Sequence, residues 1–149
     1  MQANIPRQVR ELQPESATAL ARAQAIAWDS VDPALLELCR CRVLGLLQPG
    51  TGAGPAPAGV PAPEAARRAA LDAWQRSSLF SPLERAALAY TEQYVLSVSS
   101  VSDAQVQALR EHLADAEVYA FAAALYVIEM GERLRLVSSA MLGNGGEDG

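Results

Sequence analysis

The chain has 149 residues, and its 12 basic residues are all arginine against 17 acidic ones, which gives a formal net charge of −5. The absence of lysine excludes Schiff-base chemistry, attachment of pyridoxal phosphate and a phosphate-loop lysine. The acidic balance argues against a nucleic-acid binder, because binding of that kind needs a basic face. One histidine and two cysteines are too few for a Cys₂His₂ or His₃ zinc site. We therefore expect no metal, no cofactor and no nucleic-acid partner.

The composition predicts one all-α domain. Alanine, the best helix former, occurs 29 times, and aromatic residues make up only 5% of the chain. The longest apolar run, Val118 to Ile128, has 11 residues and is too short to span a bilayer. The N-terminus shows no apolar segment of a secretory signal, and two thiols fit a reducing compartment. We therefore expect a cytoplasmic protein without a membrane segment.

Six helices are predicted from the spacing of apolar residues, after an N-terminal arm that ends near Gln13. The domain should cover residues 1–142, and 143–149 should be a disordered tail. The sixth helix is much the longest. The predicted helices cover residues 14–28, 33–47, 64–76, 82–98, 103–113 and 115–142.

Polar residues mark where several of these helices begin. Asp32 precedes a proline, and Ser81 and Ser102 open the patterns SPLE and SDAQ, which are typical of capping boxes. Asp115 is the predicted cap of the last helix, and Gly143 is its predicted stop.

Residues 48–63 read QPGTGAGPAPAGVPAP and hold five of the nine prolines and four of the ten glycines. The segment carries no charge, and Val60 is its only large side chain. This composition predicts a flexible, partly polyproline loop. Its 16 residues exceed the usual length of a connection between helices.

Three stretches resemble one known family. Residues 74–88 read WQRSSLFSPLERAAL, residues 36–43 read LELCRCRV, and residues 101–118 begin with VSD and end with DAEV. In this order and spacing they are similar to the carboxymuconolactone decarboxylase and alkylhydroperoxidase D-like family. The resemblance covers about residues 33–142. It implies a six-helix alkylhydroperoxidase D-like domain and a homo-oligomer, since trimers and hexamers recur in the family.

The same resemblance locates what this chain lacks. Redox members place a glutamate twelve residues before a C-x-x-C pair, which a histidine follows. Glu37 matches the glutamate, but Pro49 and Gly52 stand where the cysteines belong. The last helix of many members reads roughly INxxNR, and residues 128–133 here read IEMGER. The resemblance therefore implies a degenerate member without the redox pair.

Both cysteines lie upstream of that position. By helical phase Cys39 lies with Leu35 and Val43 and should be a buried core thiol. Cys41 falls on another side, four residues after Glu37, and a neighbouring carboxylate raises a thiol pKa. A disulfide between the two is excluded because residues two apart on a helix point away from each other.

Glu37 has two interpretations. The resemblance implies a retained proton-relay acid, whereas the simpler interpretation is a helix-surface carboxylate paired with Arg40.

Glu129 and Glu132 near the end of the long apolar stretch are further candidates. Glu129 falls on the stripe of Val118 and Leu125, where a carboxylate must be paired or protonated. Arg42 falls on the apolar arc of its own helix. We therefore predict that Arg42 forms a structural ion pair with Glu129 or Glu132 across the core.

The single histidine, His112, lies at a helix end and is expected in solvent rather than in catalysis. The aromatic residues at helical spacing either pack in the core or line a small apolar pocket. They are Trp28, Trp74, Tyr90, Tyr94, Phe121 and Tyr126.

Three functions stay open. The first is binding of a small apolar molecule, or of a catalytic paralogue, by a member without the redox pair. The second is acid–base catalysis on a carbonyl or lactone substrate through Glu37, Glu129 or Glu132. The third is residual peroxidase activity through Cys41. The sequence leaves open whether the protein is an enzyme.

Overall fold

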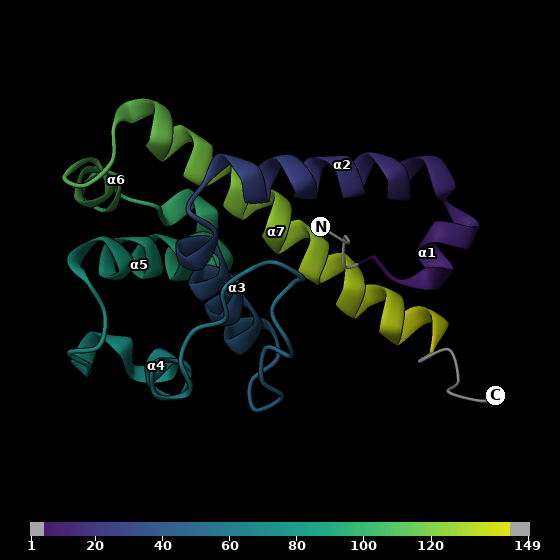
Figure 1. The fold of residues 1–149 in the computed structure, drawn as a ribbon, viewed down its shortest axis with the longest axis horizontal. Helices are drawn as coiled ribbons and strands as arrows, with labels where there is room; N and C mark the ends of the chain where they lie inside the picture. The colour runs from purple at the N-terminus through teal and green to yellow at the C-terminus, as the bar shows by residue number, and fades with distance from the viewer. Residues whose placement is uncertain (1–4, 144–149) are drawn as a thin grey trace.

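The computed structural model describes residues 5–143 and shows an all-α protein (Figure 1). Seven α-helices and two 3₁₀ helices, η1 and η2, form the regular structure of these residues, and no strand occurs among them. In chain order the elements are α1 (Arg7–Leu12), α2 (Pro14–Ser30), α3 (Pro33–Leu47), α4 (Ala65–Ala70), η1 (Leu71–Arg76), α5 (Pro82–Ser97), η2 (Val98–Ser100), α6 (Asp103–Arg110) and α7 (Asp115–Leu142).

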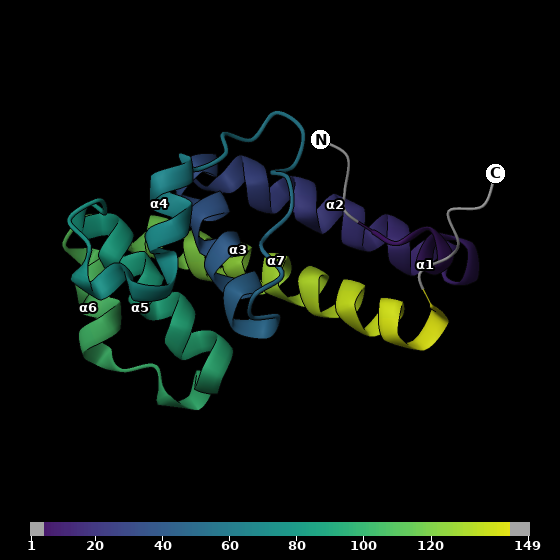
Figure 2. The same cartoon turned by 90° about the horizontal axis from the view of Figure 1, so that it is seen from below.

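The long helix α7 crosses the molecule, and α2 lies alongside it in both views (Figures 1 and 2). Helix α3 packs on α7 and on α5, and α6 packs on α5 and on the start of α7. Helix α1, which precedes α2, packs against it and touches α7. Within residues 5–143 no helix combines the length and hydropathy needed to cross a membrane.

Helix α3 is the central helix of the fold. Every residue from Leu35 to Cys41 is buried, including the charged Glu37 and Arg40. Helices α2, α5 and α7 pack around it, and the 48–63 loop lies against it. A helix covered on all sides has no polar face, so the spacing of its apolar residues does not show which side chains meet which neighbour.

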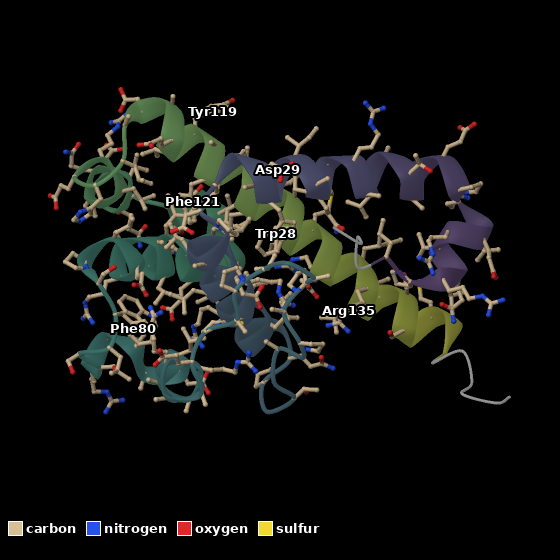
Figure 3. All side chains as sticks on the ribbon, in the orientation of Figure 1. Trp28, Asp29, Phe80, Tyr119, Phe121 and Arg135 are labelled. Carbon is tan, nitrogen blue, oxygen red and sulfur yellow. The ribbon has the colours of Figure 1, made fainter. Side chains whose placement is uncertain are left out.

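Three clusters of apolar side chains form the core around α3. In one of them Phe121, labelled in Figure 3, is fully buried. Its ring meets the ring of Tyr90 edge-on, with 5.7 Å between the two ring centroids. A second cluster contains Trp28 and a third contains Phe80. Burying one such side chain contributes roughly 1.5–3 kcal/mol, so these clusters are the main source of stability.

Several local predictions are confirmed. The Asp32 carboxylate accepts a hydrogen bond from the N–H of Ala34 at 3.0 Å. Ser81 accepts from Glu84, and Ser102 and Gln105 form a reciprocal capping box. Helix α7 ends at Leu142, and Gly143 has φ +74°, a conformation that glycine adopts without strain.

Other local predictions need correction. The N-terminal arm contains helix α1, and the predicted helix 64–76 is interrupted by the non-helical Ala73. Asp115 does not cap α7. Instead the Glu117 carboxylate accepts from the N–H of Ala114 at 2.7 Å, while Asp115 pairs with Arg110. Of the predicted tail, residues 144–149 lie outside the described residues.

Candidate functional site

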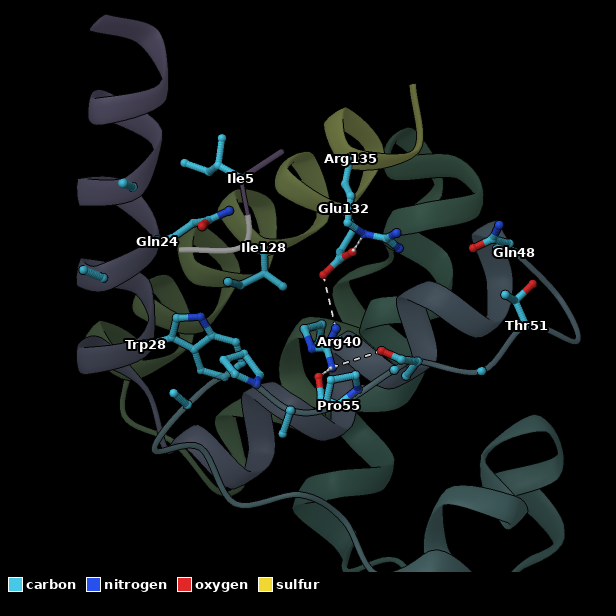
Figure 4. A pocket seen from close by; sticks show the side chains of 18 of the residues that line it. Ile5, Gln24, Trp28, Arg40, Gln48, Thr51, Pro55, Ile128, Glu132 and Arg135 are labelled. Atoms are coloured by element: carbon cyan, nitrogen blue, oxygen red, sulfur yellow. Dashed lines mark hydrogen bonds and ion pairs between the residues drawn. The ribbon is translucent and has the colours of Figure 1, made fainter. Parts of the chain in front are cut away.

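A pocket of about 680 Å³ opens between α2, α3, α7 and the start of the 48–63 loop (Figure 4). Trp28 and Gln24 enter it from α2, Ile128 and Glu132 from α7, and Arg40 from α3. The volume lies in the range of sites that hold small organic molecules. Its wall is therefore partly apolar and partly charged, and Arg40, Glu132 and Arg135 lie close together in it.

The Pro/Gly-rich loop forms one wall of this pocket. Nη2 of Arg40 donates to the backbone carbonyls of Ala53 at 3.4 Å and Pro55 at 3.2 Å. All four glycines of the loop have positive φ, and Val60 packs in the cluster of Trp28. The prediction that residues 48–63 form no helix is confirmed, but α3 holds the loop in place.

An ion network of four side chains borders the pocket. Nε and Nη2 of Arg40 donate to the two carboxylate oxygens of Glu37 at 2.7 and 2.8 Å. Nη1 of Arg40 donates to Glu132 at 3.2 Å, and Nε of Arg135 donates to the other Glu132 oxygen at 3.0 Å. Two carboxylates and two guanidinium groups therefore balance in charge.

Arg40 is the centre of the network. Its side chain is only 5% exposed, and that of Glu37 is fully buried. Burial by itself lowers the pKa of Arg40, but the hydrogen bonds and charge of Glu37 and the charge of Glu132 outweigh it and raise that pKa above its ordinary value. Arg40 is thus a permanent cation.

The predicted pairing of Arg42 with Glu129 or Glu132 is wrong. Arg42 donates to Glu92 at 2.8 Å and to Asp72 at 3.0 Å, on the side of α3 that faces α5 and η1. Glu129 pairs with Arg133, one turn further along α7, and the partner of Glu132 across the core is Arg40. An ion pair does join α3 to α7 across the core, but its α3 member is Arg40, two residues before Arg42.

Glu37 is therefore not on the helix surface. It is paired with Arg40, as the simpler interpretation expected, yet both side chains lie in the interior. Because Arg40 stands between Glu37 and the pocket, Glu37 supports the site and does not line it.

The two thiols are buried in the interior. Burial raises the pKa of Cys39 to about 12, and burial followed by the charge of Glu37 raises the pKa of Cys41 to about 12. The Cys41 thiol donates to Glu37 at 3.5 Å. Among residues 5–143 the pocket lining includes neither cysteine. The expected burial of Cys39 and raised pKa of Cys41 are confirmed.

His112 is exposed in the connection between α6 and α7, as expected. Of the six aromatic candidates Trp28 lines the pocket, whereas the others pack elsewhere or face solvent. Nε1 of Trp74 donates to Glu92 at 2.7 Å, and Tyr126 is 53% exposed.

Gln24, Arg40 and Arg135 were missed as lining residues. A signal for Gln24 was present, because it lies four residues before Trp28 and so shares its face of α2. No such signal separates Arg40 from Arg42, because α3 is covered on all sides.

No protein-family model, curated protein or solved structure matches this chain. Within the described part of the chain no group of three His, Cys, Asp or Glu side chains gathers as a metal site.

Proposed function

We propose that the protein binds a small, largely apolar molecule in the pocket beside α3. The observation that carries this proposal is the 680 Å³ pocket, which Trp28 and Ile128 line together with Arg40 and Glu132 of the charge-balanced network. Pockets with an apolar wall and a few fixed polar groups are typical of small-molecule sites.

The hydrogen bonds of the carboxylates favour binding over catalysis. Both oxygens of Glu37 accept from Arg40, and the two oxygens of Glu132 accept from Arg40 and Arg135. A general base must direct a basic oxygen at the substrate proton. Every oxygen of these two carboxylates already accepts from a guanidinium group, which supports an architectural role.

Acid–base catalysis on a carbonyl or lactone compound is the second candidate, because Glu132 lines the pocket. In that case Glu132→Gln abolishes turnover of the bound compound and leaves its binding in place. Peroxide reduction through Cys41 has less support, since a buried thiol with a pKa of about 12 supplies almost no thiolate near neutral pH. Replacing both cysteines by serine tests it.

We further propose that the chain is a carboxymuconolactone decarboxylase-like protein without the redox pair. The motifs of residues 33–142 support this, and so does the loop that stands in the place of the cysteine pair and contacts Arg40. Exposed apolar side chains on α7 support a homo-oligomer or a catalytic paralogue as partner, and two free thiols support a cytoplasmic protein. The α7 residues are Tyr119, Tyr126, Val137 and Met141.

The test uses fluorescence of Trp28. The chain has two tryptophans, so Trp74→Phe leaves Trp28 as the only reporter. Toluene and cyclohexanone are titrated into this variant while its emission and melting temperature are followed. Ala21→Phe fills the pocket, and Ala19→Phe adds the same side chain to the exposed side of α2.

We expect saturable binding that Ala21→Phe removes and Ala19→Phe retains. Binding that Ala21→Phe leaves unchanged contradicts the proposal, as does the absence of binding by either compound up to its solubility limit.

A further inference from the structure

Gln24 is a polar residue of the pocket that lies outside the ion network, as Gln48 and Thr51 also do. The residue is only 6% exposed and lines the pocket, yet its amide makes no hydrogen bond with any of residues 5–143. Its amide reaches the open space of the pocket, because the enclosed polar side-chain atoms without a partner among these residues lie elsewhere, on Arg67 and Glu84. An amide of this kind that borders a cavity is placed to meet a ligand.

A glycine on α7 makes room for this amide. A Cβ atom at position 131 would lie 2.4 Å from Nε2 of Gln24, so no larger residue fits there without displacing the amide. Glycine inside a helix is unfavourable compared with alanine, and Gly131 lies in the middle of the 28-residue α7. Gly131 therefore leaves room for the amide in this position, and a larger residue would make the flexible end of Gln24 shift.

The chemistry of the amide limits its partner. A glutamine side chain presents a donor and an acceptor side by side in one plane, which matches a carbonyl next to an N–H. Trp28 lies one helical turn from Gln24 and also borders the pocket, so its ring can cover the flat face of a planar molecule (Figure 4).

The charges around the pocket limit the ligand further. Glu37 and Glu132 are balanced by Arg40 and Arg135, so this ion network adds no excess charge to the pocket. Arg10 also borders the pocket but is exposed, and solvent screens its charge. An anion in the pocket would lose its hydration without gaining an unpaired cation, so a neutral ligand fits better.

We propose that the pocket selects neutral, planar molecules with an amide-type edge, that is, a carbonyl beside an N–H. Gln24 pairs with both groups of this edge, and Trp28 packs against the ring. The inference rests on the proposed function and names the ligand class for the same pocket.

Four probes of similar size test this selection by NMR titration of the Trp74→Phe protein. They are 2-pyridone, N-methyl-2-pyridone, benzoate and toluene. The first has the complete edge, the second lacks the N–H, the third is an anion and the fourth has no polar group. We expect 2-pyridone to bind about tenfold more tightly than each of the others, since two hydrogen bonds separate it from toluene.

Two variants assign the preference to the amide. Gln24→Leu keeps the approximate size of the side chain and should abolish the preference for 2-pyridone over toluene, read as the ratio of their two dissociation constants. Gly131→Ala keeps the amide but displaces it and should also reduce the preference. If Gly131→Ala does not fold, Gln24→Leu decides the question alone.

The outcomes separate this inference from the proposed function. If toluene binds but 2-pyridone gains nothing, or if Gln24→Leu retains the gain, the inference is overturned and small-molecule binding stands. Tighter binding of benzoate than of 2-pyridone overturns the selection of a neutral ligand. If no probe binds, both proposals are overturned.

Discussion

Replacing Arg40 by methionine should strongly destabilise the fold, because Arg40 neutralises two buried carboxylates. The side chains of Arg40, Glu37 and Glu132 are 5%, 0% and 7% exposed. After the replacement Glu132 still pairs with Arg135, but Glu37 has no cation within the described residues. Removal of one partner from a buried ion pair costs about 3–5 kcal/mol.

For a domain whose free energy of unfolding is about 5–15 kcal/mol, this loss is a large fraction of the total. At about 2–4 °C per kcal/mol for a chain of this size, the melting temperature should fall by about 6–20 °C.

Urea unfolding followed by circular dichroism measures these free energies. Arg42→Met is the matched control, because Arg42 is 11% exposed and its partners Glu92 and Asp72 are 19% and 88% exposed. We expect it to cost about 1–2 kcal/mol. The double variant Glu37→Leu with Arg40→Met should recover much of the loss, since no charge is left unpaired. An equal or larger loss for Arg42→Met, or no recovery in the double variant, refutes the reasoning.

Three further predictions concern thiols, caps and core. At pH 8 a disulfide reagent should label neither Cys39 nor Cys41 until the chain unfolds. Because the pKa of Cys41 is raised in the folded state, the free energy of unfolding should fall as the pH rises from about 8.5 toward about 12. This fall should be smaller in Cys41→Ala. Ser102→Ala should cost about 1 kcal/mol in thermal unfolding by removing the cap of α6. Phe121→Ala should lower the free energy of unfolding by about 3–5 kcal/mol. Tyr119→Ala, at an 80% exposed position on the same helix, should change it by less than about 0.5 kcal/mol. Similar losses for the two variants would contradict the assignment of the core.

The sequence determined those features whose causes lie within a few residues. Asp32 and Ser102 cap their helices because a short polar side chain reaches the free N–H groups of the first turn. The Pro/Gly composition of residues 48–63 was enough to exclude a helix there. The apolar stretch of α7 and the abundance of alanine determined the fold class.

The tertiary structure decided which charged groups meet. An assignment from the spacing of apolar residues requires a helix with one face toward solvent. Helix α3 is instead enclosed by α2, α5, α7 and the loop. Arg40 and Arg42 are therefore both covered, and only the packing distinguishes their partners. The pocket likewise depends on long-range contacts. Gln24 and Gly131 lie far apart in the sequence, and their close approach exists only because α2 packs on α7.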